Sequence, residues 1–236
     1  MSGFPKYVSV ADKRAVAARK LKRLKKQLPD IQPVLIEGSK IATTWWGISW
    51  NKNLEGYADF SNRISRGRSY VKNGSIAHLE IGNGIVEALV FGSNSSPYQV
   101  RINIEKISKQ NWEHITELCG HSIDSLDELS LGQFPKDLKT LFMSQGDGLF
   151  PTPDEIQMQC SCPDWATMCK HVAAVMYGIG TRLDHNPILF FKLRNAPYEE
   201  LIRQSIENRL GTMLENANQK SDRTIKDTDI ESLFEL

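Results

Sequence analysis

Four side chains that bind soft divalent metals are gathered in one short stretch of this chain. Cys160 and Cys162 form a Cys-x-Cys pair, and Cys169 and His171 form a Cys-x-His pair six residues later. Three thiolates and one imidazole complete a tetrahedral structural zinc site and leave no position for a substrate or a water molecule. The alternatives are a coincidental cluster of buried cysteines and a redox pair, but a redox pair would leave Cys169 and His171 without a role. The spacing therefore predicts one structural zinc ion.

A strand, a turn and a helix are expected to position these ligands. Residues 155–159 read as a strand, and alternate residues of a strand share a face, so both thiols of the Cys-x-Cys pair would point the same way. Pro163 and Asp164 favour a reversal of the chain. A helix predicted over 170–183 then begins at the second ligand pair, where the positive helix end favours thiolate. The apolar stripe of this helix predicts that it packs into the core, so loss of the metal should unfold at least this region.

Neighbours of the ligands are expected to tune the centre. Three thiolates on a divalent ion leave a net charge of about −1, and Lys170 is a natural neutralising neighbour. The ring nitrogen of His171 that does not bind the metal needs an acceptor, for which Asp164 or a backbone carbonyl is expected.

The pattern of the whole chain predicts an α+β protein. We expect a small antiparallel β-meander with helices, together with a helical region that carries the Cys3His strand-loop-helix unit. The expected parts are a basic helical arm at 1–30, a β-rich domain at 31–107, a helical region at 108–210 with the zinc unit at about 156–185, and an acidic, mobile tail at 211–236.

Local signals predict the individual elements. Asn73-Gly74 and Asn83-Gly84 are strong hairpin signals between segments rich in strand-forming residues. Strands are expected over 34–37, 68–72, 75–81, 85–92, 98–104 and 155–159, and helices over 11–28, 44–57, 111–119, 122–129, 136–143, 170–183 and 198–210. Trp46 and Trp50 lie about one helical turn apart, which favours a place in the core over a base-stacking platform.

The composition bounds the class of protein. Of 236 residues, 40% are hydrophobic and 24% are charged, which is typical of an ordinary soluble globular protein. No apolar run approaches the ~18 residues of a membrane span, and the first residues lack the apolar core of a signal peptide. We therefore expect a cytoplasmic protein with no membrane partner. Reduced cysteines in metal-ligand spacing agree with that compartment.

A basic segment near the start of the chain could contact a polyanion. Between residues 6 and 26 there are nine Lys or Arg residues, Lys20 and Arg23 among them, against one acid. Prolines follow at 29 and 33, so we expect this arm to be separate from the core. It is a solvated surface helix, a phosphate-contacting helix or a membrane-surface helix.

A second basic segment surrounds Tyr70 in a predicted hairpin. Its cations are Arg63, Arg66, Arg68 and Lys72. Single-strand binders use such cations for phosphates and aromatic rings for bases, although an ordinary solvated hairpin has the same composition. The net charge of the whole chain is only +1, which counts against a dedicated high-affinity DNA binder.

The metal motif resembles the SWIM zinc finger, which has the pattern Cys-x-Cys, a variable gap, then Cys-x-His. The run 160–177, with the upstream runs 41–55 and 66–74, is similar to the bacterial branch of that family, so the resemblance covers most of residues 1–210. SWIM domains occur in Mutator-type transposases, in recombination-associated proteins and in bacterial proteins associated with helicase-like ATPases of the SWI/SNF class. The resemblance implies a DNA-binding or protein-interaction module whose zinc ligands are Cys160, Cys162, Cys169 and His171.

Two functions remain open from the sequence. The first is a non-catalytic accessory protein that binds nucleic acid, with DNA favoured, in association with a helicase-like ATPase or a similar machine. The second is a protein-interaction adaptor with no nucleic-acid binding of its own. The sequence has no Gly-x-x-x-x-Gly-Lys-Ser/Thr phosphate loop, so any motor must be another polypeptide. His78 beside Glu80 and His114 near Glu117 lack a nucleophile or a second metal cluster, so we predict that the protein is not an enzyme.

Overall fold

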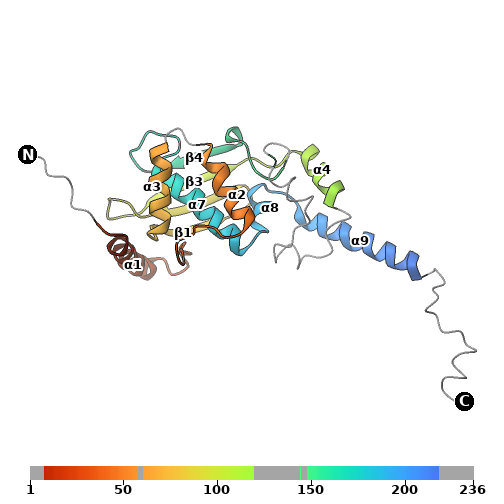
Figure 1. Ribbon diagram of the computed structural model, residues 1–236, viewed down its shortest axis with the longest axis horizontal. Coiled ribbons are helices and arrows are strands. Elements are labelled where there is room, and N and C mark those ends of the chain that lie inside the picture. Colours follow the sequence, from red (N-terminus) through yellow and green to blue (C-terminus); the bar gives the residue numbers. More distant parts are fainter. Residues whose placement is uncertain (1–7, 58–60, 120–143, 145–147, 218–236) are drawn as a thin grey trace, which may run out of the picture.

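The computed structural model describes residues 8–57, 61–119, 144 and 148–217 (Figure 1). The elements are α1 (Val10–Gln27), α2 (Trp45–Glu55), α3 (Ser61–Lys72), β1 (Ile76–Ile81), β2 (Ile85–Val90), β3 (Tyr98–Ile104), α4 (Lys109–Cys119), a 3-10 turn (Pro153–Glu155), β4 (Ile156–Cys160), α7 (Lys170–His185), α8 (Leu189–Leu193) and α9 (Tyr198–Ala217). No helix within the described ranges combines the length and the apolar character that a bilayer crossing requires.

The strands form one antiparallel sheet in the order β1-β2-β3-β4, which confirms the predicted α+β class and meander. The turn between β1 and β2 contains the second Asn-Gly signal, as predicted, and Gly84 has the positive φ of 70° that such a turn requires. Strand β4 lies beside β3 with Cys160 opposite Val100. The sheet therefore draws its fourth strand from the range 108–210, and one hydrophobic core runs through both this range and 31–107.

Helix α7 is the centre of the core. It packs against the sheet on one side and against α2 and α3 on the other (Figure 1). Most of its residues are buried around the whole circumference, which is the pattern of an interior helix. The indole N–H groups of Trp46 and Trp50 donate to the carbonyls of Leu183 and Met176 on this helix, each at 2.8 Å. Both tryptophans are buried, so their predicted place in the core is confirmed.

The structure corrects the first predicted hairpin. Residues 68–72 are not a strand but the last part of α3, which buries Ile64, Gly67 and Val71 at helical spacing. The first Asn-Gly signal ends this helix instead of turning a hairpin. Gly74 has a φ of 69°, and its N–H donates to the carbonyl of Val71, while the N–H of Ser75 donates to that of Tyr70. A left-handed glycine serves a helix end as well as a hairpin, so the same dipeptide fits both structures.

Other predicted boundaries differ in part. Residues 34–37 are not in a regular strand, although the N–H of Val34 donates to the carbonyl of Ile76 in β1. Helix α9 continues past the predicted end at 210 to Ala217, and α8 was not predicted. The predicted helices 122–129 and 136–143, and residues 218–236 of the predicted tail, lie outside the described residues.

A buried ion pair fastens the segment after α8 to the turn before β4. The Arg194 side chain is only 1% exposed, and its Nη2 atom donates to Oε1 of Glu155 at 2.6 Å. Burial raises the pKa of the Glu155 carboxyl, but hydrogen bonds from Arg194 and Thr152 outweigh it, so the pKa lies below its ordinary value. The carboxylate also accepts from the Thr152 N–H at 2.7 Å.

Replacing Gly67 with alanine should destabilise the contact between α3 and α7. A Cβ atom at this position would lie 2.5 Å from the Ala173 side chain and 2.8 Å from its backbone carbon, so α3 would have to move away from α7. We expect Gly67→Ala to lower the free energy of unfolding by about 1–3 kcal/mol, measured by urea unfolding. Gly211→Ala in α9 is the matched control, because nothing lies within 4 Å of its Cβ position. It should be neutral or stabilising by up to about 1 kcal/mol. A Gly67→Ala protein as stable as the parent would contradict the close packing.

Candidate zinc centre

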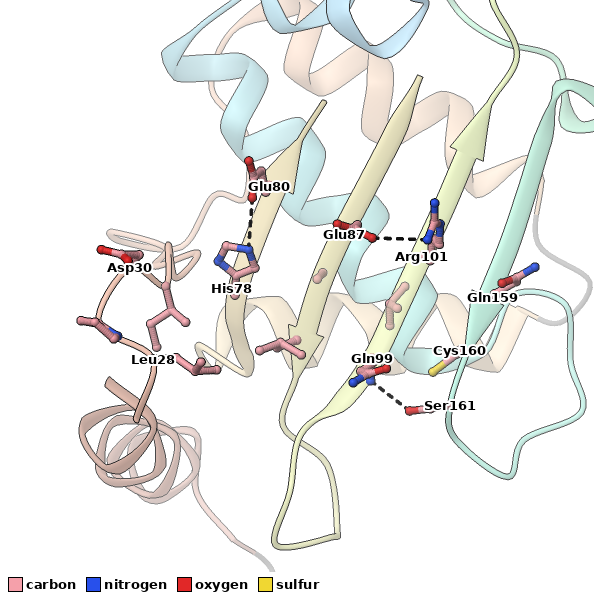
Figure 2. A pocket seen from close by; sticks show the side chains of 15 residues that line it. Leu28, Asp30, His78, Glu80, Glu87, Gln99, Arg101, Gln159, Cys160 and Ser161 are labelled. Carbon is pink, nitrogen blue, oxygen red and sulfur yellow. Dashed lines mark hydrogen bonds and ion pairs between the residues drawn. The ribbon is translucent and has the colours of Figure 1, made fainter. Parts of the chain in front are cut away.

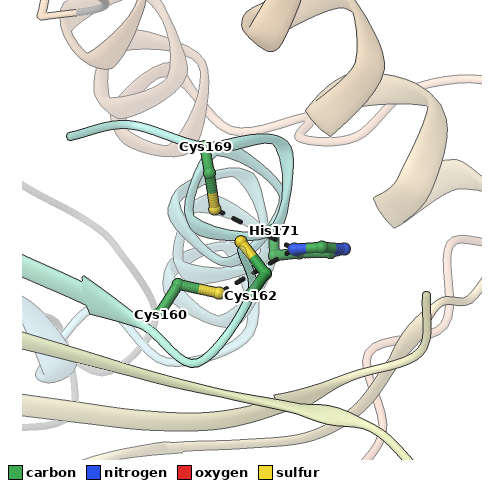
Figure 3. Close-up of side chains that lie close together, drawn as sticks. All are labelled: Cys160, Cys162, Cys169 and His171. Carbon is green, nitrogen blue, oxygen red and sulfur yellow. Dashed lines mark hydrogen bonds between the residues drawn. The ribbon is translucent and has the colours of Figure 1, made fainter. Parts of the chain in front are cut away.

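The four predicted ligands converge where β4 ends and α7 begins (Figure 3). Their ligand atoms all lie within 4.8 Å of one another. Nδ1 of His171 is 3.8 Å from Sγ of Cys160 and 3.9 Å from Sγ of Cys169. A tetrahedral zinc ion with Zn–S near 2.3 Å and Zn–N near 2.0 Å separates its ligand atoms by about 3.5–3.8 Å. The side chains therefore lie close to the spacing that zinc needs, with Nδ1 of His171 as the imidazole ligand.

The backbone stabilises negative charge at one of the thiols. Cys169 caps α7, and its Sγ accepts from the Val172 N–H at 3.5 Å. The pKa of Cys169 is lowered to about 4, first by the hydrogen bond from Cys160 and then by His171 and by backbone N–H groups. The pKa of Cys160 is raised, by its hydrogen bond with Cys169 and by burial. Because the pKa values of Cys160 and Cys169 move in opposite directions, a bound cation would favour the ionisation of all three thiols.

The imidazole of His171 is held between two aromatic rings. Its ring centroid lies 5.4 Å from that of Tyr70 on α3 and 4.5 Å from that of Tyr98 on β3. Gly92 also packs against this imidazole: a Cβ atom on Gly92 would lie 2.4 Å from the Tyr98 ring and 3.0 Å from Nε2 of His171. No spacing in the sequence pairs these three residues with the histidine, so sequence reasoning could not have found them.

The prediction that Asp164 accepts a hydrogen bond from the second ring nitrogen of His171 is wrong. Asp164 does not accept from His171 but pairs with Arg63, whose Nη2 lies 3.1 Å from Oδ1 of the carboxylate. Nε2 of His171 is buried, and no hydrogen-bond partner for it lies among the described residues. Asp164 therefore anchors the zinc loop to α3 and does not orient the ligand.

The predicted basic residues separate into two groups. Arg68 pairs with Glu55 and donates to the Tyr177 hydroxyl at 3.1 Å, and Arg63 is held by Asp164, so both have structural partners. Arg66 is exposed, and Lys72 is half-buried at the end of α3. All four lie on the helix α3 and not on a hairpin.

The basic helix α1 is attached to the same end of the molecule. Nζ of Lys20 donates to the carbonyls of Gly92 at 3.1 Å and Asn94 at 3.2 Å, and Arg14 donates to the carbonyl of Lys72 at 2.9 Å. Lys20 therefore binds the loop that packs on His171. Arg23, one turn further along α1, is exposed.

The sheet face that α7 does not cover is polar (Figure 2). A hollow of about 840 Å³ lies over it, with His78 and Arg101 among its walls. Arg101 pairs with Glu87 at 3.6 Å on the exposed surface. Nδ1 of His78 accepts a hydrogen bond from the Gln32 N–H at 3.0 Å. Nε2 of the same ring lies 3.7 Å from Oε2 of Glu80, the acid with which the sequence analysis paired it. These contacts give His78 a structural role in attaching the segment after α1 to β1.

Comparison with known proteins places the metal centre in a family. The SWIM zinc finger model matches residues 146–178, which include all four ligands. The chain is 36% identical over 163 residues to the uncharacterized protein Rv2102 of Mycobacterium tuberculosis. That match covers 69% of this chain and 58% of the relative, so the chain spans little more than half the length of the relative. No solved structure matches the chain. The Cys3His cluster and the family match together identify a zinc ion as the bound metal, and residues 146–178 of the chain form a SWIM zinc finger.

Proposed function

We propose that this protein is a non-catalytic accessory protein that binds nucleic acid, with DNA favoured, beside a helicase-like ATPase of the SWI/SNF class or a similar machine. The zinc ion has a structural role in this proposal, because its four protein ligands leave no position for chemistry. The nucleic acid would contact basic residues that the zinc unit and its neighbours hold in place.

The observation that carries the proposal is the gathering of cations around the zinc end of the molecule. Lys20 links the basic helix α1 to the loop that packs on His171, and Arg63 links α3 to the zinc loop. Two helices rich in exposed cations, among them Arg23 and Arg66, are thereby attached to the same unit. Such a surface binds phosphates through counterion release.

The test is fluorescence anisotropy with labelled single-stranded DNA, duplex DNA and RNA against the zinc-loaded protein over a salt series. We expect binding that weakens steeply with salt. Replacing both Arg23 and Arg66 with alanine should reduce the slope of log K against log salt by about 1.5, because each lost phosphate contact removes about 0.7–0.9. Arg101→Ala is the matched control, since this arginine is exposed on the open sheet face. No binding at low salt, or equal slopes for all three proteins, would contradict the proposal.

A second function, that of a protein-interaction adaptor, is favoured by one feature of α9. Ile206, Leu210, Met213 and Leu214 lie at helical spacing on this helix and are each at least 54% exposed. An exposed apolar stripe of this kind binds another apolar surface. If the oligonucleotides do not bind, a Leu210→Glu/Leu214→Glu protein that loses a partner retained by the parent would support the adaptor.

A further inference from the structure

One large aromatic side chain in the zinc loop lies on the surface of the molecule. Trp165 is 82% exposed, although it stands between the two zinc ligand pairs and has buried residues close to it in the loop. Ala166 is 7% exposed and Met168 is 1% exposed. Trp46, Trp50 and Trp112, in contrast, are at most 8% exposed. A tryptophan displayed on a rigid support is costly in water and is a typical recognition residue.

The loop fixes the position from which Trp165 projects. The Oδ1 atom of Asp164 accepts from the Ala166 N–H at 3.4 Å and from Arg63 at 3.1 Å. Asp164 thus closes a tight turn around Trp165 and ties that turn to α3. The buried side chain of Ala166 and the zinc ligands hold the other side. Because the support is already ordered, a ligand of the ring would lose little affinity to ordering the loop.

Cations flank this turn. Residues 63, 66 and 70 share one face of α3, and Arg63 contacts the turn while Tyr70 contacts His171. Arg66 lies between them on that face and is exposed. Lys170 stands in the first turn of α7. Asp164, the acid next to Trp165, is already paired with Arg63, and Arg66 and Lys170 add positive charge on the two helices that adjoin the turn.

We infer that Trp165 is a stacking platform for a base of single-stranded nucleic acid, with Arg66 and Lys170 contacting the adjacent phosphates. An exposed ring beside cations is the arrangement by which proteins bind single strands without reading their sequence. A duplex does not offer the face of an internal base, so single strands should bind more tightly than duplexes. This inference rests on the proposed function and assigns it a strand type and a contact residue.

The experiment compares a labelled oligothymidylate with an oligomer of the same length that lacks bases, by anisotropy at one salt concentration and then over a salt series. For oligothymidylate we expect Trp165→Ala to weaken binding by about tenfold to a hundredfold, with the salt slope unchanged. Trp165→Phe should retain part of the affinity because phenylalanine keeps a ring. The base-free oligomer should bind the parent and Trp165→Ala equally. Thr167→Ala, an exposed position in the same loop, is the matched control.

The outcomes separate the two proposals. The zinc content and the thermal unfolding of each variant are measured to check that the variant is folded. We expect the Trp165 variants to fold, because the Trp165 side chain is exposed. If Trp165→Ala binds oligothymidylate like the parent, the stacking inference is overturned while nucleic-acid binding stands. If it weakens binding to both oligomers equally, the ring does not contact a base and the inference is also overturned. If the parent binds no oligonucleotide at low salt, the proposed function itself is wrong, and Trp165 would then be tested as a protein contact.

Discussion

Removal of zinc by a chelator should unfold the region around β4 and α7. Apparent binding free energies of structural zinc ions are about 10–16 kcal/mol, as large as the whole stability of a typical domain. The ligands lie at the junction of β4 with α7, and α7 contacts every strand as well as α2 and α3. We expect a large loss of helical circular dichroism and of the cooperative thermal transition, restored when zinc is added back.

The matched variants for this prediction lie in the same loop. Cys162→Ser should lose zinc and the cooperative transition together, because a serine hydroxyl is a poor substitute for a thiolate ligand. Thr167→Ala should bind one zinc ion per chain and unfold like the parent, since residue 167 is exposed. Zinc content is measured by atomic absorption beside each unfolding curve. A metal-free Cys162→Ser protein that unfolds like the parent would contradict the structural role of the ion.

Replacing Glu155 with glutamine should strongly destabilise the fold, although this residue is not a zinc ligand. Glutamine keeps the size of the side chain but leaves the buried guanidinium of Arg194 without its charge partner. Breaking one half of a buried ion pair costs about 3–5 kcal/mol. Urea unfolding at pH 7 measures the loss. Glu87→Gln is the control, because its pair with Arg101 is more than half exposed on both sides and is worth at most about 1 kcal/mol.

The effect of Glu155→Gln should depend on pH in a defined direction. The folded pKa of Glu155 is depressed, so its carboxylate contributes stability above the unfolded pKa of about 4.3, and this contribution is lost as the pH falls through the folded pKa. The difference between parent and variant should therefore be largest near pH 7 and shrink below about pH 4. Because zinc release in acid affects both proteins, the quantity compared is the difference between their free energies of unfolding. A difference that grows on acidification would refute the depressed pKa.

The parts of this protein that could be predicted from sequence are those determined by local chemistry. The four zinc ligands are close together in the chain and have no other common use at that spacing, and they converge as expected. Strand β3 and the turn at Gly84 follow from alternating residues and an Asn-Gly signal. Helix α7 follows from its apolar pattern and its cap by Cys169.

Helix α3 could not be predicted in the same way, because its signals point to two structures. Tyr70 and Val71 favour a strand by propensity, and the following Asn-Gly pair favours a hairpin. What decides the outcome is the close approach of Gly67 to Ala173, a contact between residues far apart in the chain. Tertiary packing therefore overrides local preference at this position, and the partners of Arg63 and Arg68 were hidden for the same reason.

The short spacing of the metal ligands also bears on the order in which the chain folds. All four lie within residues 160–171, so zinc closes a small loop at little entropic cost, whereas β4 must find β3 with Cys160 opposite Val100. A chain that has bound zinc brings the end of β4 and the start of α7 to the sheet as one preformed piece. We expect the search for a distant strand to become the docking of a rigid unit, so that folding is faster when zinc binds before β4 pairs with β3.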